Sequence, residues 1–375
     1  MKRSARRILL ALLLVCLYIL WHPDPTREEL LVEAAWAVRP DTATASGFDD
    51  VSGAVLPIRV AGGFAYVDER GRVASTGRVA HDVALAADAF VNYGRLPAQL
   101  VVQNPAGEFT ASLPLSGYPL FAHGRLFVVS AGGGRLSEWT REGALLWNAE
   151  LVAPLTAIAA SPGMVGLGLV SGGPMVLDAA GDPIELQRPS VAVEPVVYAV
   201  AVSDDPDRFA VTSGAHAQAA DPDEALPATV TLYELDGDRG VPVVRRSIAR
   251  TGAATPIVRL FDEGRTLAYT SWADLPRLVM LDVGSGDDAR VDLRYPAEDA
   301  VELDAHGLKA VLSVGTRRDP ARGFARPAEL ALASSAGTVP VRTGWASDAA
   351  ALDVHGDLLT IRVDDRVLGV RLEVR

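Results

Sequence analysis

The chain has 375 residues, of which 49% are hydrophobic and 34 are glycines, and it carries a formal net charge of -12. An apolar fraction of this size excludes an intrinsically disordered chain and suits a well-packed globular β domain. The negative charge argues against a nucleic-acid partner, because phosphate binding requires a basic surface.

Residues 1–25 are predicted to form a targeting segment. An apolar run from Ile8 to Trp21 follows four cations, which are Lys2, Arg3, Arg6 and Arg7. We expect an uncleaved membrane anchor, and the alternatives are a cleaved signal peptide and a lipoprotein modified at Cys16. All three place the rest of the chain outside the cytoplasm, so we expect attachment to the inner membrane with the folded part in the periplasm or outside the cell.

Residues 26–52 are predicted to be a juxtamembrane helix followed by a linker. Thr26 can cap a helix that runs to Val38, and Glu28 and Glu29 would lie in its first turn, where the helix dipole favours anions. This helix would pack on the folded domain or act as a docking helix. The small and polar stretch from Pro40 to Ser52 is predicted to be the linker into a domain over residues 53–375.

A glycine-punctuated unit recurs along the predicted domain. The turn glycines Gly71, Gly107, Gly143 and Gly181 are separated by 36, 36 and 38 residues, and looser copies follow near Gly237, Gly284 and Gly337. A period of roughly 40 residues with short strands and glycine turns is typical of β-propeller blades. Glycine suits these turns because the backbone needs a positive φ there.

A second turn precedes the first in most units, for example at His123-Gly124, Pro162-Gly163 and Glu263-Gly264. Two hairpin turns in each repeat give four strands, which make one blade. The sequence therefore predicts an all-β propeller of seven four-stranded blades, or of eight if the tail after Asp348 forms its own blade. The first unit is one strand short, and we expect the C-terminal strands to complete it and remove the exposed sheet edge.

The stretch SEWTREGALLW, from Ser137 to Trp147, resembles the docking motif of PQQ-like propeller repeats. The turns DEGRTLAY and HGDLLTI resemble the hairpins of WD40-like propellers. Other units replace the terminal tryptophan, for example with Leu186 or Val244. Members of these groups in bacterial envelopes are often non-enzymatic assembly or scaffold proteins, and the resemblance implies such a role.

No catalytic, cofactor-binding or metal-ligating set is predicted. Quinoprotein dehydrogenases share the propeller but need a calcium site and a catalytic Asp, and no corresponding set is recognisable in the sequence. His123, His306 and His355 each precede a glycine in separate hairpins, so we interpret them as turn residues rather than metal ligands. The alternatives left open are a propeller hydrolase or lyase, and a small-ligand or glycan sensor, each using the central funnel.

The predicted partner-binding surface is a sector of long loops in neighbouring units. Insertions fall between the second and third strands of several units, so these loops would emerge on one face. Exposed aromatics beside arginines are typical of binding hot spots. The predicted contact residues are Trp272, Arg277, Arg317, Arg318, Arg322, Phe324 and Arg326. The expected partner is another envelope or membrane protein, although the acidic and basic loops could instead pair with one another.

Overall fold

The computed structural model describes residues 30–374 except for the gaps 41–44, 46, 49–54, 61, 96, 171–172, 188–195, 206, 215–224, 252–255, 273–274, 296, 306–307, 317–327, 335–341, 346–348, 356–357 and 364–365. The predicted targeting segment, residues 1–25, lies outside this range. Within the described range, no helix has the length and the apolar composition needed to cross a membrane.

The described chain forms seven hydrogen-bonded sheets of antiparallel meanders. The first half of the chain contributes a three-stranded sheet, β2 (Val55–Val60), β3 (Gly63–Asp68) and β4 (Val73–Arg78), and two four-stranded sheets. These are β5 (Asp82–Leu85), β6 (Phe90–Tyr93), β7 (Leu100–Gln103) and β8 (Phe109–Leu113), then β9 (Gly117–Ala122), β10 (Arg125–Ser130), β11 (Arg135–Trp139) and β12 (Leu145–Glu150).

An eight-stranded sheet comes next. It joins β13 (Leu155–Ala160), β14 (Met164–Leu169), β15 (Met175–Asp178) and β16 (Pro183–Leu186) to β17 (Val196–Val202), β18 (Arg208–Gly214), β19 (Ala225–Asp236) and β20 (Arg239–Thr251). Two four-stranded sheets follow, β21 (Val258–Phe261), β22 (Thr266–Trp272), β23 (Pro276–Asp282) and β24 (Asp288–Asp292), then β25 (Ala297–Ala305), β26 (Leu308–Thr316), β27 (Ala328–Ser334) and β28 (Arg342–Trp345). The last sheet contains β29 (Ala349–His355), β30 (Leu358–Val363), β31 (Arg366–Val374) and β1 (Leu30–Val38).

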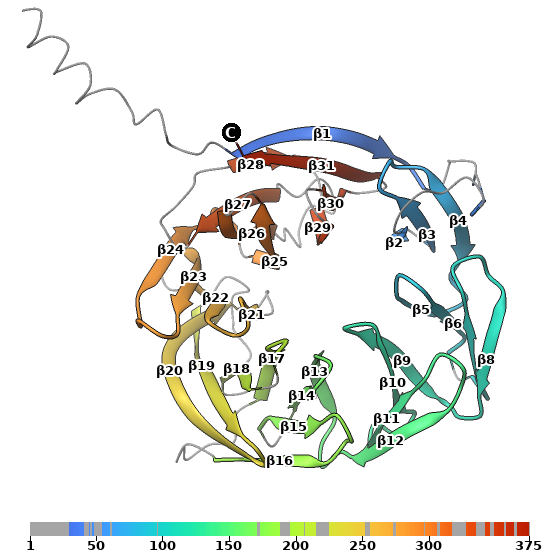
Figure 1. Cartoon of the computed structure of the whole chain (residues 1–375), viewed down its shortest axis with the longest axis horizontal. Helices are drawn as coiled ribbons and strands as arrows, with labels where there is room; N and C mark the ends of the chain where they lie inside the picture. The colour runs from blue at the N-terminus through green and yellow to red at the C-terminus, as the bar shows by residue number, and fades with distance from the viewer. Residues whose placement is uncertain are drawn as a thin grey trace, which may run out of the picture.

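The sheets stand around a common axis, with the first strand of each meander near the centre and the last strand at the perimeter (Figure 1). The prediction of an all-β propeller is confirmed. The predicted number of seven four-stranded blades, or eight, is wrong, because only five sheets of the described chain are separate four-stranded blades. The difference arises because β16 pairs in parallel with β20 and merges two meanders, and because β2–β4 forms a sheet of three strands.

The N-terminal strand β1 contradicts the helix predicted from Thr26 to Val38. It pairs with β31 from Leu30↔Val374 to Val38↔Val367 and is the perimeter strand of the last sheet. The propeller therefore includes residues before the predicted boundary at residue 53. The expectation that the C-terminal strands complete the first unit is also wrong, because β29–β31 form their own sheet with β1.

The last hairpin turn of each early unit uses the same local chemistry. Gly71, Gly107, Gly143 and Gly181 have φ values of 77°, 83°, 87° and 85°, as their sequence period predicts. Three residues before each glycine, a polar side chain accepts a hydrogen bond from a backbone N–H of the turn. These side chains belong to Asp68, Asn104, Thr140 and Asp178.

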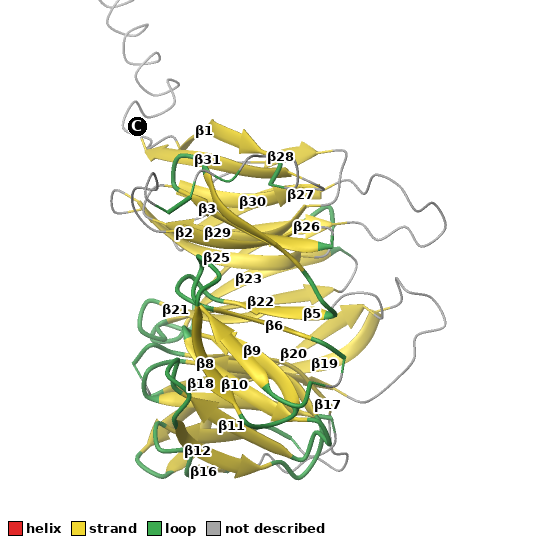
Figure 2. Ribbon diagram, turned by 90° about the vertical axis from the view of Figure 1, so that its right-hand side faces the viewer, coloured by secondary structure: helices red, strands yellow, loops and turns green. Residues whose placement is uncertain are grey.

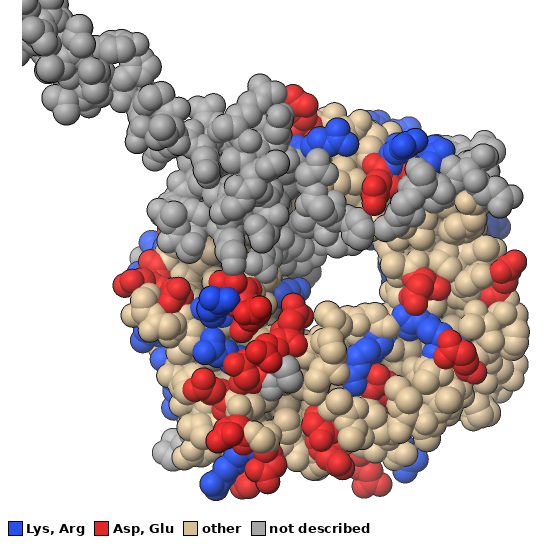
Figure 3. Space-filling model, in the orientation of Figure 1, with Lys and Arg blue, Asp and Glu red and all other residues tan. Residues whose placement is uncertain are grey.

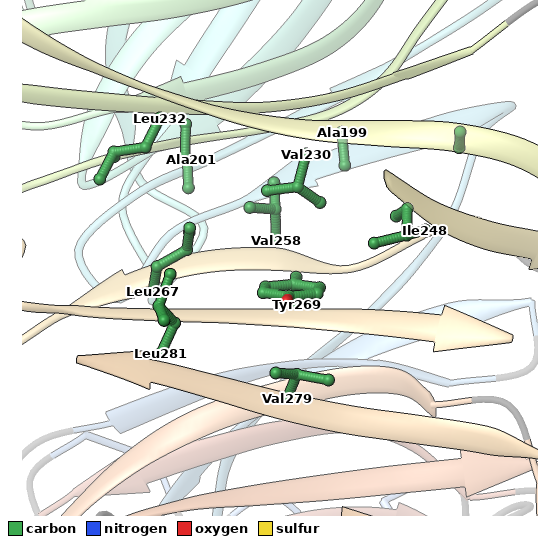
Figure 4. Packing of buried hydrophobic residues seen from close by; sticks show 12 residues of the cluster. Ala199, Ala201, Val230, Leu232, Ile248, Val258, Leu267, Tyr269, Val279 and Leu281 are labelled. Atoms are coloured by element: carbon green, nitrogen blue, oxygen red, sulfur yellow. The ribbon is translucent and has the colours of Figure 1, made fainter. Parts of the chain in front are cut away.

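Blades pack face to face through apolar side chains, and inner strands such as β3 and β14 are buried along their whole length because both of their faces are covered. One such cluster joins β17–β20 to β21–β23 through side chains that include Val230, Val258 and Tyr269 (Figure 4). At about 25 cal/mol per Å² of buried apolar area, these contacts supply the main stabilisation of the ring. Rigid blades of this kind fix the strand ends from which the connecting loops start.

Candidate functional site

The two faces of the ring differ in their connections. Seen from the side, the strands run between two opposite faces that carry the loops and turns (Figure 2). In the four-stranded meanders, the hairpin turns between first and second strands and between third and fourth strands lie on one face, which we call the turn face. The connections between second and third strands lie on the opposite face, which we call the long-loop face. Residues 215–224 join β18 to β19, residues 273–275 join β22 to β23, and residues 317–327 join β26 to β27. The predicted position of the insertions, between second and third strands, is confirmed.

Only part of the predicted partner-binding set falls within the described residues. Trp272 ends β22, and Arg277 is the second residue of β23. These two residues lie on either side of the short loop 273–275, because Trp272 is the register partner of Pro276. The remaining predicted residues lie outside the described chain and stay predictions; they are Arg317, Arg318, Arg322, Phe324 and Arg326.

The loop between β22 and β23 presents apolar surface on a rigid base. Trp272 is half-buried, whereas Leu275 is 51% exposed. The Arg277 Nε donates a hydrogen bond of 2.6 Å to Asp292 Oδ1, across the β23–β24 pair. An exposed ion pair of this kind contributes about 0–1 kcal/mol to stability, so Arg277 can exchange Asp292 for a partner's carboxylate at little cost.

A buried arginine next to this loop was not predicted from the sequence. Arg250, near the end of β20, is 8% exposed and lies over the Tyr198 ring at 4.2 Å from its centroid. It also donates a 2.8 Å hydrogen bond to the Tyr198 hydroxyl. The sequence held a signal for this burial, because Arg250 is two residues from the buried Ile248 and so shares its side of the strand.

The acidic side chains of the same sector gather on the turn face, which Figure 3 shows over β17–β24. They are Asp204, Asp205, Asp207, Glu234, Asp236, Asp238, Asp262, Glu263, Asp282, Asp287 and Asp288, in or beside the turns of these strands. Arg265 and Arg290 pair with acids of this group. The sector therefore has an acidic turn face, while the arginines Arg250 and Arg277 lie toward the long-loop face.

The centre of the ring is open in the space-filling view (Figure 3). A polar cluster lies at the start of the innermost strand β5, where Asp82 accepts hydrogen bonds from Arg59 at 2.6 Å and from the Tyr93 hydroxyl at 3.1 Å. Burial alone would raise the Asp82 pKa, but the hydrogen bonds from Val83 and Arg59 hold it below its usual value. Burial and the Asp82 carboxylate raise the pKa of Tyr93 to about 12. Asp82 is therefore an ionised acceptor near neutral pH, which is unlike a general acid.

Within the described residues, no three His, Cys, Asp or Glu side chains are arranged to hold a metal ion. The interpretation of His123 as a turn residue is confirmed, because its φ is 47° and Gly124 follows with a φ of 69°. Asp204, Asp205 and Asp207 likewise lie in the turn between β17 and β18. His306 lies outside the described residues, and the side chain of His355 does too.

The ring of radial antiparallel sheets defines a β-propeller. A family model described as "beta-propeller protein" matches residues 1–220, which is more than half of the chain, so the chain belongs to this family. No curated protein matches the sequence.

Solved structures support the same fold. The computationally designed protein Ika8 matches with 14% identity and a TM-score of 0.58, over 91% of this chain and 100% of its own. The Dos1 propeller matches with 10% identity and a TM-score of 0.53, over 91% of this chain and 95% of its own. BamB from Moraxella catarrhalis, with 15% identity over 91% of this chain and 98% of its own, has a TM-score of 0.39, which is too low to inform the function. The sequence resemblance to WD40-like and PQQ-like repeats agrees with these matches, which at such identities establish the fold alone.

Proposed function

We propose that this propeller is a non-enzymatic scaffold that binds another protein through the long-loop face over β17–β28. The observation that carries the proposal is the loop between β22 and β23, where the exposed Leu275 lies between the half-buried Trp272 and the replaceable ion pair of Arg277. An apolar centre with an aromatic and an arginine is the composition of binding hot spots. The long connections 215–224 and 317–327 emerge from the two flanking blades and would enlarge the surface.

We further propose that the scaffold works outside the cytoplasm, held to the inner membrane by residues 1–25. The four cations before an apolar run support this placement, because cationic flanks orient such segments with the N-terminus in the cytoplasm. A partner in the same membrane or envelope would then meet the scaffold at high local concentration. Fractionation and protease protection of the propeller in intact and opened cells would test this placement; a chain recovered wholly in the cytoplasm would overturn it.

The docking surface can be tested by site-specific photo-cross-linking in cells that produce the full chain. A photoreactive residue at Leu275 should cross-link to one discrete partner. Two matched positions serve as controls: Val152, which is 79% exposed and lies between β12 and β13, and Phe109, which is 68% exposed on β8. Cross-links of the same partner from all three positions, or none from Leu275, would contradict the proposed surface.

A second test uses charge and shape instead of proximity. Leu275→Glu combined with Arg277→Glu should reduce recovery of the cross-linked partner by at least tenfold, because two favourable contacts become a buried charge and a repulsion. The triple variant Arg317→Ala, Arg318→Ala and Phe324→Ala asks the same question of the neighbouring loop. If both variants keep the partner at the level of the unmodified chain, it binds elsewhere on the propeller.

A further inference from the structure

The perimeter strand β20 is unusually long for its position. It has 13 residues, whereas the perimeter strands β8, β12 and β24 have 5, 6 and 5. Long edge strands present unpaired backbone groups, and proteins usually shorten or cover them. Figure 1 shows β20 as an arc on the outside of the ring.

The first part of this edge is already paired. The backbone N–H groups of Glu185 and Gln187 donate to the carbonyls of Asp238 and Gly240, so β16 runs parallel to the beginning of β20. Beyond Gly240, no described strand pairs with the outer edge of β20. The edge of β20 therefore accepts a parallel strand over its first residues, and beyond them it has no strand partner among the described residues.

The backbone polarity of the remaining edge follows from two hydrogen bonds. The Gly240 carbonyl points outward to Gln187, and the Ala249 N–H points outward to Ser271 Oγ at 3.4 Å. The backbone groups of successive residues point alternately inward and outward, and the register shift near Val243 adds one residue to this alternation. The N–H and C=O groups of Arg245 and Ser247, which lie between Gly240 and Ala249, therefore also point outward. Pro242 also falls at an outward position, where its missing N–H costs the β19–β20 ladder nothing.

The side chains beside this edge offer defined chemistry. Val241 and Val243 are 44% and 45% exposed. Because of the register shift, Val241 lies on the side of β20 that carries Val244 and Ile248, which pack on the next blade. The exposed Arg245 and Ser247 lie on the opposite side. A groove of about 300 Å³ lies where β16 ends, lined by Glu185, Gln187, Arg239 and Val241.

We propose that the outer edge of β20 from Val243 to Ser247 binds an extended segment of a partner protein, which adds as a strand parallel to β20. Its N-terminal end would enter the groove beside Gln187, where β16 stops. Apolar side chains of this segment would cover Val241 and Val243, and an acidic side chain would pair with the Arg245 guanidinium. Strand addition draws its affinity from main-chain hydrogen bonds and its specificity from alternate side chains. This surface is distinct from the long-loop face, so the two proposals stand or fall separately.

The test uses a fluorescent eight-residue peptide with valines in its N-terminal half and glutamates alternating with threonines in its C-terminal half. Binding to the full chain in detergent is followed by fluorescence anisotropy. Ser247→Pro removes one outward N–H without removing a β19–β20 hydrogen bond, and Arg245→Glu reverses the side-chain charge. Each variant should weaken binding at least tenfold, whereas Leu275→Glu on the long-loop face should leave it unchanged.

Three outcomes would overturn the proposal. The first is binding by Ser247→Pro at the level of the unmodified chain. The second is equal binding of a peptide whose glutamates are replaced by lysines, because charge complementarity would then be absent. The third is a tenfold gain in affinity when residues 188–195, which follow β16, are replaced by a glycine-serine linker, because the chain itself would then be the occupant. If Ser247→Pro does not fold, a peptide N-methylated at alternate residues tests the same hydrogen bonds from the other side, and unchanged affinity would reject the strand addition.

Discussion

Two tryptophans cover equivalent turns at two seams of the ring. Trp147 on β12 lies over the turn of Gly181 in the next meander, and Trp36 on β1 lies over the turn of Gly71. A Cβ at Gly181 would lie 2.5 Å from the Trp147 ring, and a Cβ at Gly71 would lie 2.7 Å from the Trp36 ring. The first seam joins two sheets that are neighbours in the sequence, whereas the second joins β2–β4 to the sheet in which β1 pairs with the C-terminal strands β29–β31.

The two tryptophans are held in place by different interactions. Trp147 is 8% exposed, and its Nε1 has no hydrogen-bond partner among the described residues, so it acts through apolar packing. Trp36 is half-buried, and its Nε1 donates to the Glu69 carbonyl at 2.8 Å. A tryptophan over a glycine turn is therefore held by burial at the internal seam and by a specific hydrogen bond at the seam that closes the ring.

The largest expected effect is at the internal seam. Trp147→Ala should lower the free energy of unfolding by about 3–5 kcal/mol, the usual cost of truncating a buried aromatic. Denaturant unfolding measures this change. Leu146→Ala, on the neighbouring 56% exposed side chain, is the matched control and should change stability by less than about 0.5 kcal/mol. Equal losses in the two variants would show that Trp147 does not hold the seam.

At the closing seam, Trp36→Ala should cost less, about 2 kcal/mol, because less area is buried and one net hydrogen bond is lost. Hydrogen exchange should also localise the effect. Amides of β1 and β31 should exchange faster in the variant, while those of β9–β12 keep their protection. A uniform loss of protection around the ring would mean that closure and the internal seam are one cooperative unit.

Alanine at the covered glycines sharpens the comparison. Gly71→Ala and Gly181→Ala each place a Cβ against a tryptophan ring at a positive φ, and we expect each to cost about 1–2 kcal/mol. Gly107→Ala keeps the positive φ of 83° but meets nothing within 4 Å, so it isolates the backbone contribution. If Gly107→Ala is as costly as the other two, contact with the tryptophans adds nothing.

The smallest effect concerns acid sensitivity at the closing turn. Burial alone would raise the Asp68 pKa, but hydrogen bonds from the Arg72 and Arg70 backbone and the Arg72 guanidinium lower it. Because the Asp68 pKa is lower in the folded state, the ionised carboxylate stabilises the fold at pH values above the unfolded-state pKa of about 3.9. This stabilisation is lost as the pH falls through the folded-state pKa. Asp68→Asn should therefore cost about 1 kcal/mol at pH 7 and leave thermal stability less dependent on pH below about 4. Melting curves between pH 7 and pH 3 would reveal an unchanged acid dependence if Asp68 is not the group involved.

The sequence predicts the internal seam well and the closing seam poorly, for a physical reason. Trp147 comes four residues after the turn glycine Gly143, so the motif is local and Gly143 indicates where the strand begins. Trp36 also belongs to a perimeter strand, but its sheet partners β29–β31 lie at the far end of the chain. Without those partners in view, the charged and apolar pattern after Thr26 fits a helix as well as a strand, and tertiary pairing decides between them. The available signal was the repeat spacing, because Trp36, Ser75, Ala111 and Trp147 follow one another at successive steps of 39, 36 and 36 residues.

The features of the candidate site also fall into those that the local repeat predicts and those that depend on contacts between distant residues. The positions of the long connections followed from the repeat, because an insertion that keeps both hairpin turns of a unit lies either between its second and third strands or in the connection to the next unit. The burial of Arg250 had a signal in the sequence, but its contact with Tyr198 could not be predicted, because the two residues are 52 positions apart and meet only through the sheet. The long edge of β20 was also missed, since strand length depends on how far β19 extends beside it.

The antiparallel pairing of β1 with β31 also decides how the molecule bears mechanical load. Tension applied upstream of Leu30 and directed along β1 acts parallel to the strand, so the hydrogen bonds from Leu30↔Val374 to Val38↔Val367 resist together in shear. The same pairing leaves Val374 beside Leu30, so a fusion at the C-terminus emerges at the same point of the perimeter. A tag fused after Val374 would therefore report on, or obstruct, a partner that is attached through the residues before Leu30.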